Sequence, residues 1–280
     1  MNDTGPGRRA WLFVPGHRPS RFDRARSSGA AAVICDLEDA VPDDQKAEAR
    51  HNIRSWLDSG GTALVRINGV GTPWHEQDVV ELAGAAGLKG WVLPKVEKAE
   101  DVAALAGTAT GQQLVMPIIE SAVAVERLES ILCHRLIGRA VLGSVDLAAD
   151  LGVEHSSPLL DHVRARVVIA SRAARRQAPI DGVTTGFSDP RRTEADSRNA
   201  RRAGFGGKLA IHPDQVGPIE RGFRPHPDEV AWARAVIDGA DRGGRGAFSV
   251  DGAMVDAPVI IRARQILADA AGTEQEDESR

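Results

Sequence analysis

Residues 114–150 read LVMPIIESAVAVERLESILCHRLIGRAVLGSVDLAAD. Two short apolar runs, Leu114–Ile119 and Arg139–Leu142, enclose the helical pattern of Ala122–Ser130. Continuous apolar strands that alternate with helices are typical of a parallel sheet covered by helices. This stretch therefore predicts one strand–helix–strand unit of an α/β fold.

The same alternation recurs along most of the chain. Eight runs have the character of buried strands: Trp11–Val14, Ala32–Leu37, Ala63–Ile67, Gly90–Leu93, Leu114–Ile119, Arg139–Leu142, Ile180–Thr184 and Lys208–Ile211. Helical patterns lie between them: Arg18–Ser28, Asp43–Asp58, Trp74–Ala86, Ala99–Ala106, Ala122–Ser130, Leu159–Gln177 and Arg191–Ala203. The rival architecture is an open doubly wound sheet, but the first strand is not followed by G-x-G-x-x-G. We therefore predict a (β/α)₈ TIM barrel.

The pattern changes after Gly222, which predicts a barrel over residues 1–222 and an extension over 223–280. In the extension we expect a helix over Asp228–Asp238, a strand over Ala247–Val250 and a last helix from about Pro258. Segments below about 70–80 residues are too small to be stable alone. We therefore expect the extension to pack on the barrel or on a neighbouring subunit. From about Gly272 the acidic tail GTEQEDESR predicts disorder.

The composition is that of a globular protein, with 42% hydrophobic and 26% charged residues among 280. The formal net charge of −4 gives no reason to expect nucleic acid or a membrane surface as a partner. The two cysteines, Cys35 and Cys133, do not suggest a disulfide framework. No run approaches the ~18 apolar residues of a membrane span. We therefore predict a cytoplasmic protein.

Acidic residues follow two neighbouring strands. Glu120 comes directly after the fifth run, and Asp146 occupies the matching place after the sixth. Barrel enzymes carry their functional side chains at the carboxyl ends of the strands. Mg²⁺ is typically held by one or two carboxylates, with substrate and water completing the coordination. The pair predicts a divalent-cation site, and the alternative is that each acid merely caps the following helix.

Basic residues at the same end predict an anionic substrate. Arg66 leaves the third run and could hold a carboxylate or an enolate oxygen; the alternative is a structural ion pair with Asp36 or Glu38. Lys95 after the fourth run raises a Schiff-base aldolase as a competitor, against a structural pairing with Glu97 or Glu120.

Three arginines, Arg18, Arg21 and Arg24, follow the first run with a spacing that places them near one side of a helical turn. They suit nucleotide phosphates such as those of coenzyme A, or form an ordinary charged surface. His212 ends the eighth run before a proline, where a structural role is the usual one.

Taken together, these segments resemble the citrate lyase β-subunit-like branch of the HpcH/HpaI aldolase superfamily, near the malyl-CoA and citramalyl-CoA lyases. The matching segments are Leu12–Gly16 with Arg18-Pro19, Asp36–Asp39, Val65–Asn68, Leu93–Lys95, Pro117–Ser121, Gly143–Leu147, Ile211–Pro213 and Met254–Asp256. The chain departs from the pattern at Ser144, where relatives carry another small residue or a glutamate, and at His17. These departures bear on the preference for the acyl group.

The resemblance implies Mg²⁺ on Glu120 and Asp146 and substrate contact by Arg66. It implies that Phe13, Arg21, Arg24, Ile211 and His212 border a CoA thioester. It also implies a homo-oligomer, a trimer or hexamer, in which Asp256 acts as catalytic acid and base, on a segment that is typically placed over a neighbouring subunit's site. Without the resemblance, Asp256 is an acid at a helix N-terminus before Pro258.

The function expected from these residues is magnesium-dependent cleavage of a 3-hydroxy-3-carboxyacyl-CoA into a 2-oxo acid and an acyl-CoA, by a reversible Claisen-type reaction. The alternative is a class II pyruvate aldolase that acts on free hydroxy-oxo acids. A third hypothesis is a non-catalytic CoA-binding protein on an inherited barrel. No nucleic acid, membrane or lyase partner subunit is expected.

Overall fold

The fold was obtained as a computed structural model, which describes residues 7–105, 114–243, 248–250 and 252–277. By its internal contacts the chain divides into two compact units, essentially Arg9–Gly222 and Phe223–Arg280. In the described part of the chain, no helix is both long and apolar enough to cross a membrane.

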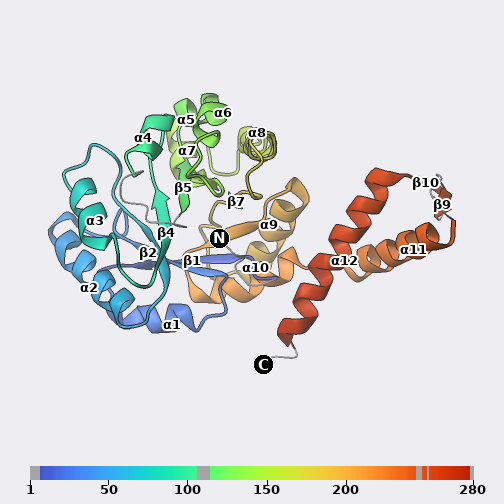
Figure 1. Ribbon diagram of the computed structural model, residues 1–280, viewed down its shortest axis with the longest axis horizontal. Helices are drawn as coiled ribbons and strands as arrows, with labels where there is room; N and C mark the ends of the chain where they lie inside the picture. Colours follow the sequence, from blue (N-terminus) through green and yellow to red (C-terminus); the bar gives the residue numbers. More distant parts are fainter. Residues whose placement is uncertain (1–6, 106–113, 244–247, 251, 278–280) are drawn as a thin grey trace. The chain divides into compact units, whose positions relative to one another are not determined.

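The first unit is a closed barrel of parallel strands (Figure 1). Its strands are β1 Ala10–Pro15, β2 Ala32–Asp36, β3 Ala63–Arg66, β4 Leu88–Leu93, β5 Leu114–Ile119, β6 Val141–Leu142, β7 Ile180–Asp181 and β8 Gly207–Ala210. Each strand pairs with the next, and β8 pairs with β1 to close the ring. The predicted (β/α)₈ barrel is therefore confirmed, and each predicted apolar run overlaps one strand.

The interior of the barrel is filled by large apolar side chains, to which every strand contributes: Trp11, Ile34, Leu64, Val92, Met116, Ile118, Val141, Ile180 and Leu209. Side chains alternate along a strand, so the residue two positions further on faces the same way. Asp36, Arg66 and Glu120 stand two residues after Ile34, Leu64 and Ile118. The strand period therefore directs these three charged side chains toward the open end above the core.

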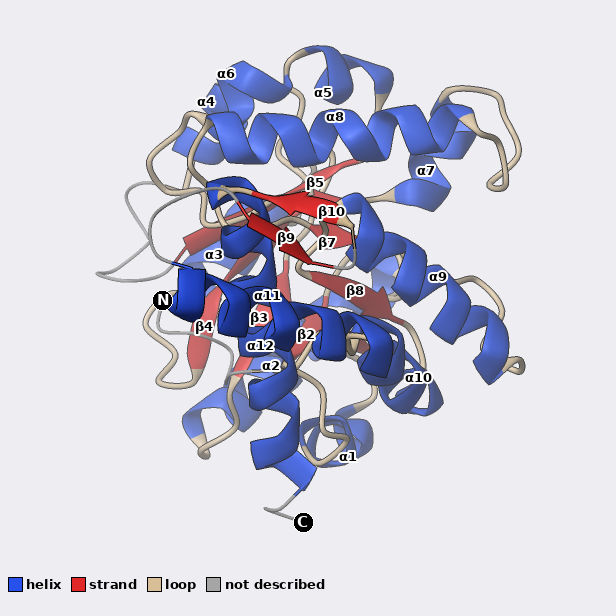
Figure 2. Ribbon diagram, turned by 90° about the vertical axis from the view of Figure 1, so that its right-hand side faces the viewer, coloured by secondary structure: helices blue, strands red, loops and turns tan. Residues whose placement is uncertain are grey.

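Helices surround the strands (Figure 2). They are α1 Phe22–Arg26, α2 Lys46–Asp58, α3 His75–Leu82, α4 Ala99–Ala103, α5 Ala122–Glu126, α6 Leu128–Leu132, α7 Ser144–Asp150, α8 Leu159–Ala173, α9 Pro190–Ala203 and α10 Val216–Phe223. Short 3₁₀ turns cover Pro19–Arg21, Asp43–Gln45 and Pro213–Gln215.

The helices differ from the prediction in three places. The helix expected over Ala122–Ser130 is two helices, because Arg127 leaves helical geometry (φ −104°, ψ 13°) between α5 and α6. The helix expected from Arg18 begins with the turn Pro19–Arg21 and continues as α1. The helix α7 was not predicted, although it carries Asp146 in its first turn.

The second unit contains α11 Pro227–Gly243, the strands β9 Phe248–Val250 and β10 Ala253–Val255, and α12 Ala257–Asp277. The two strands form an antiparallel hairpin, of which β10 was not predicted. The unit has its own small core of Ala233, Val236, Val255, Ala263 and Ile266. The helix α12 runs past Gly272, where the sequence predicted a disordered tail; residues 278–280 and Ala247, the start of the predicted strand, lie outside the described residues.

Candidate active site at the barrel mouth

Glu120 lies at the end of β5 and is buried, with 6% of its surface exposed. Its Oε1 accepts a hydrogen bond of 2.6 Å from the backbone N–H of Lys95. Lys95 adopts φ 54°, the left-handed region that non-glycine residues rarely occupy. Gly143 leaves room for the carboxylate, since a Cβ at that position would come within 2.6 Å of Glu120 Oε2. The backbone on both sides is thus shaped around one carboxylate.

Burial and acidic neighbours make Glu120 difficult to ionise. Burial, above all, and the nearby carboxylates of Glu38 and Asp146 together raise its pKa to about 8, against the lowering effects of the Lys95 N–H and Arg66. Asp146 itself is exposed, in the first turn of α7. The predicted pair of acids therefore interacts electrostatically across the end of the barrel.

Arg66 makes both ion pairs that the sequence offered as its structural alternatives. Its Nε and Nη2 each donate to Asp36 at 2.6 Å, and its Nη1 lies 2.8 Å from Glu38 Oε2. The guanidinium also lies over the ring of Phe13, 4.7 Å from the centroid. Asp36 is 1% exposed and accepts the backbone N–H of Glu38 as well. Arg66 is thereby held rigidly at the mouth, and its contact with substrate remains a prediction.

Lys95 has a different partner from those expected. Its Nζ lies 3.0 Å from Glu38 Oε1 and 3.8 Å from Asp39, not against Glu97, and only its backbone contacts Glu120. The hydrogen bond to Glu38 raises the pKa of Lys95. A Schiff base forms from the unprotonated amine, so this surrounding opposes the Schiff-base aldolase.

Lys46 contributes to the site and was missed in the sequence. This lysine is 4% exposed and donates to the backbone carbonyls of Leu37 (3.0 Å) and Glu38 (3.1 Å) and to Asn68 Oδ1 (2.8 Å). It ties the loop after β2 to the loop after β3, and so fixes the backbone that carries Glu38. One lysine at the start of a helix gives no signal of such a role in the sequence.

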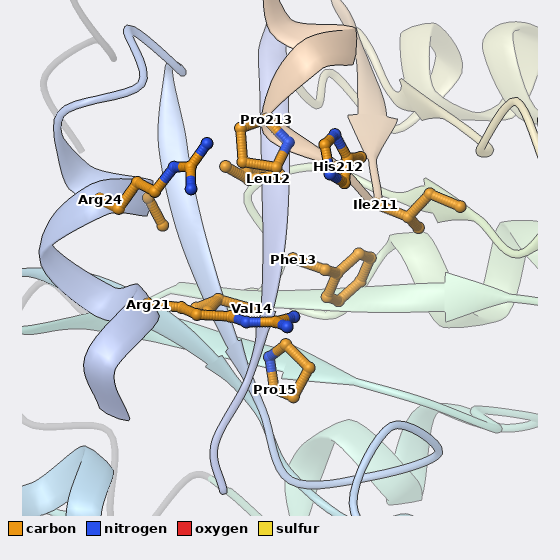
Figure 3. Close-up of a pocket in the computed structure, with 10 residues that line it drawn as sticks. Leu12, Phe13, Val14, Pro15, Arg21, Arg24, Ile211, His212 and Pro213 are labelled. Carbon is orange, nitrogen blue, oxygen red and sulfur yellow. The ribbon is translucent and has the colours of Figure 1, made fainter. Parts of the chain in front are cut away.

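A cavity of about 260 Å³ opens beside the first strand (Figure 3). Phe13, Arg21, Arg24, Ile211 and His212 all line it, as the resemblance implied. The two arginines reach in from the segment after β1, and Ile211 and His212 come from the end of β8.

One of the predicted residues lies outside this lining, and another has a second role. Arg18 precedes the turn Pro19–Arg21 and is not among the residues that line the cavity. His212 also has the structural role that its position suggested, because its Nδ1 accepts the backbone N–H of Asp214 at 3.2 Å. Its ring stacks on Phe187 with centroids 4.8 Å apart.

Asp256 belongs to the second unit. It is exposed, and its Oδ1 accepts the backbone N–H of Val259 at 3.3 Å, at the N-terminus of α12. Its contacts among the described residues are therefore those of a helix-capping acid, and its catalytic role remains a prediction.

Among the described residues, no cluster of three or more His, Cys, Asp or Glu side chains could hold a metal ion alone. Glu120 and Asp146 instead make a two-carboxylate donor set, the kind that suits a hard cation whose remaining ligands are water and substrate. The space that Gly143 leaves open for Glu120 Oε2 fits this use.

Comparison with known proteins places the chain in a family. A family model described as HpcH/HpaI aldolase/citrate lyase matches residues 9–213. A citrate lyase subunit beta-like protein of Mycobacterium tuberculosis is 35% identical, over 95% of this chain and 96% of that protein. A (3S)-malyl-CoA thioesterase of Cereibacter sphaeroides is 33% identical, over 94% of each chain.

A solved structure agrees along nearly the whole chain. The crystal structure of CitE from Mycobacterium tuberculosis in complex with magnesium, acetoacetate and coenzyme A has a TM-score of 0.85 and 34% identity, covering 95% of this chain and 98% of that one. The resemblance inferred from the sequence is confirmed, and this chain belongs to the HpcH/HpaI aldolase/citrate lyase family of carbon–carbon lyases.

Proposed function

We propose that this protein is a magnesium-dependent lyase that reversibly cleaves a 3-hydroxy-3-carboxyacyl-CoA into a 2-oxo acid and an acyl-CoA. The observation that carries the proposal is the buried Glu120, crowded by other carboxylates and placed beside Arg66 at the barrel mouth. The solved CitE complex with magnesium and coenzyme A supports both the cation and the thioester.

Glu120 and Asp146 would hold the cation. When bound, magnesium supplies Lewis-acid chemistry that lowers the pKa of the substrate's hydroxyl group. Arg66 faces the same mouth with its guanidinium fixed by Asp36, so it is oriented before substrate arrives. Such a preorganised cation would stabilise the negative charge that develops on the thioester enolate when the bond between Cα and Cβ breaks.

The cavity beside β1 supports a CoA thioester as the form of the substrate. Arg21 and Arg24 border it, and arginine suits phosphate oxygens because its donors form a planar fork. Phe13 joins the cavity to the carboxylate site, since its ring touches both the cavity and the guanidinium of Arg66. Arg18 would contribute from outside this lining.

Two other reactions are separated by their products. A class II pyruvate aldolase would cleave the free hydroxy-oxo acid without the CoA moiety. A thioesterase, the activity named for the Cereibacter sphaeroides relative, would release free CoA thiol.

The test of the proposed function supplies the protein with malyl-, methylmalyl-, citramalyl- and citryl-CoA and Mg²⁺, with and without EDTA. Free hydroxy-oxo acids serve as control substrates. The lyase releases a 2-oxo acid and an acyl-CoA from a thioester only, and loses this activity in EDTA; thiol release without 2-oxo acid would overturn it.

Asp256 is proposed as the acid and base that delivers a proton to the enolate carbon and removes it in synthesis. This assignment rests on the resemblance. Replacement of Asp256 by Asn keeps its size and the acceptor for Val259, so α12 should remain capped. We expect Asp256→Asn to abolish turnover while Mg²⁺ binding, measured by calorimetry, stays near wild type. Turnover close to the wild-type rate would refute the role.

We further propose a homo-oligomer, a trimer or hexamer, in the cytoplasm. Both cysteines are free thiols, which supports a reducing compartment. Light scattering during gel filtration measures the assembly. Mixing the inactive variants Asp256→Asn and Glu120→Gln tests whether Asp256 serves a neighbouring subunit, because restored activity requires intact residues from two different chains.

A further inference from the structure

Ser144 and His155 form a hydrogen-bonded pair next to the proposed cation site. Ser144 is the first residue of α7 and is 1% exposed. Its Oγ lies 2.8 Å from Nε2 of His155, in the segment that follows α7.

The Ser144 hydroxyl has little freedom to move elsewhere. A Cβ added to Gly182, just after β7, would come within 2.2 Å of Ser144 Oγ, so the hydroxyl fills the space that this glycine leaves. Burial, followed by the charge of Arg164, lowers the pKa of His155, which favours a neutral ring with one nitrogen able to accept. The Ser144 hydroxyl is thus confined between the backbone at Gly182 on one side and the imidazole of His155 on the other.

The pair does not have the exposure of a nucleophile and its base. A serine that attacks a thioester must present its oxygen to substrate, whereas Ser144 is almost entirely covered. Its contact instead closes the polypeptide around α7, from the first residue of the helix to a residue beyond its end.

The other end of α7 is anchored as well. Asp150, its last residue, accepts the backbone N–H of Ala122 at 2.7 Å, just after Glu120 and Ser121. A helix of two turns has little stability by itself, so its position depends on such contacts. Asp146 lies between the two anchors, and its exposed carboxylate is carried wherever α7 is placed.

We propose that Ser144 and His155 are positioning residues for Asp146, which hold the first turn of α7 so that its carboxylate meets the cation bound by Glu120. The inference rests on the proposed function, because it assumes that Glu120 and Asp146 share that cation. Partners that orient a metal ligand commonly change metal affinity about 10–100-fold when they are removed.

The test measures the Kd for Mg²⁺ by calorimetry, together with the melting temperature, for Ser144→Ala, His155→Leu and His155→Gln. Ser144→Ala and His155→Leu both remove the hydrogen bond, and each is expected to raise the Kd about tenfold. His155→Gln places an amide where Nε2 stood and should restore binding close to wild type.

The matched control is Ser197→Ala, which removes another buried serine hydroxyl, bonded to the carbonyl of Thr193 at 2.6 Å within α9. It should lower the melting temperature and leave the Kd unchanged. If it raises the Kd as much as Ser144→Ala does, the effect is general destabilisation and the inference fails.

The remaining outcomes separate the two proposals. If the wild-type protein does not bind Mg²⁺, the proposed function fails and the positioning role with it. If the wild type binds Mg²⁺ while Ser144→Ala and His155→Leu bind it equally well, the proposed function stands and only the positioning role is overturned.

Discussion

Glu120 and Asp181 are both buried acids at strand ends, 6% and 2% exposed, yet their surroundings act in opposite directions. Asp181 accepts hydrogen bonds of 3.0 Å from Lys208 and from Arg164. Burial raises the pKa of Asp181, but these two cations outweigh it and the pKa is lowered. For Glu120, burial above all, with Glu38 and Asp146 as acidic neighbours, raises the pKa to about 8.

The difference separates an acid that its own chain compensates from one that it does not. Asp181 is neutralised by side chains of its own chain, in the layer between the barrel and its helices. Glu120 has a neighbourhood with excess negative charge, against which the described part of the chain sets Arg66 and the half-exposed Lys95. A buried carboxylate that its own protein leaves under-compensated indicates a partner from outside, such as a cation.

The largest expected effect comes from Glu120→Gln, which removes the under-compensated charge. Loss of a metal ligand should cost several kcal/mol of transition-state stabilisation, and so lower kcat more than about a thousandfold. The melting temperature should hold or rise, because a neutral amide needs no ionisation among carboxylates. The measurements are cleavage rate and thermal unfolding. Glu129→Gln, an exposed position on α6, is the matched control. A large loss of stability in Glu120→Gln would contradict the comparison.

Asp181→Asn should have the opposite effect to Glu120→Gln, because it should lower the stability of the protein and leave the site intact. It leaves Lys208, 1% exposed, without its carboxylate, and breaking a buried pair in this way costs about 3–5 kcal/mol of unfolding free energy. Denaturant unfolding measures this loss, and Mg²⁺ affinity per folded molecule should stay unchanged. A variant of normal stability with poor Mg²⁺ binding would assign Asp181 to the site instead.

The ion pair between Asp181 and Lys208 predicts that the stability of the protein depends on pH. Because the pKa of Asp181 is lower in the folded protein, its stabilisation is complete above the unfolded value of about 3.9 and is lost as pH falls through the folded value. The stability difference between wild type and Asp181→Asn should therefore shrink as the pH is lowered below about 4. A difference that stays constant across this range would show that the charge of Asp181 is not its cause.

The smallest effect is expected from Lys95→Arg. Arginine keeps a positive charge near Glu38 but lacks the amine that forms a Schiff base, so cleavage should fall by no more than about tenfold. Borohydride should trap no substrate adduct on either protein. Complete loss of activity, or a trapped adduct on the wild type, would revive the Schiff-base aldolase.

The barrel and the residues of its mouth follow from the sequence because they depend on local periods. Each strand run carries its own apolar signal, and the alternation of side chains points Asp36, Arg66 and Glu120 to one end. Family resemblance then supplied Phe13, Ile211 and His212, which also line the cavity.

What the sequence did not predict depends on contacts between distant segments. The helix α7 has too few residues to show a helical period, and β10 is a strand of three. Lys46 and the pair of Ser144 with His155 are polar residues whose burial only the assembled fold determines. The ion pairs of Arg66 were foreseen as an alternative, whereas Glu38 as the partner of Lys95 was not.

Gly143 has a consequence for engineering the substrate preference of this enzyme. A methyl group there would meet the Cβ of Glu120 at 2.5 Å and Ile118 at 2.8 Å, so a mutant library that varies this position would consist of damaged enzymes whatever the substrate. Val145, two residues along and 43% exposed, offers a place to vary size without that collision. Random mutagenesis of the segment from Gly143 into α7 would therefore be more productive with Gly143 held constant.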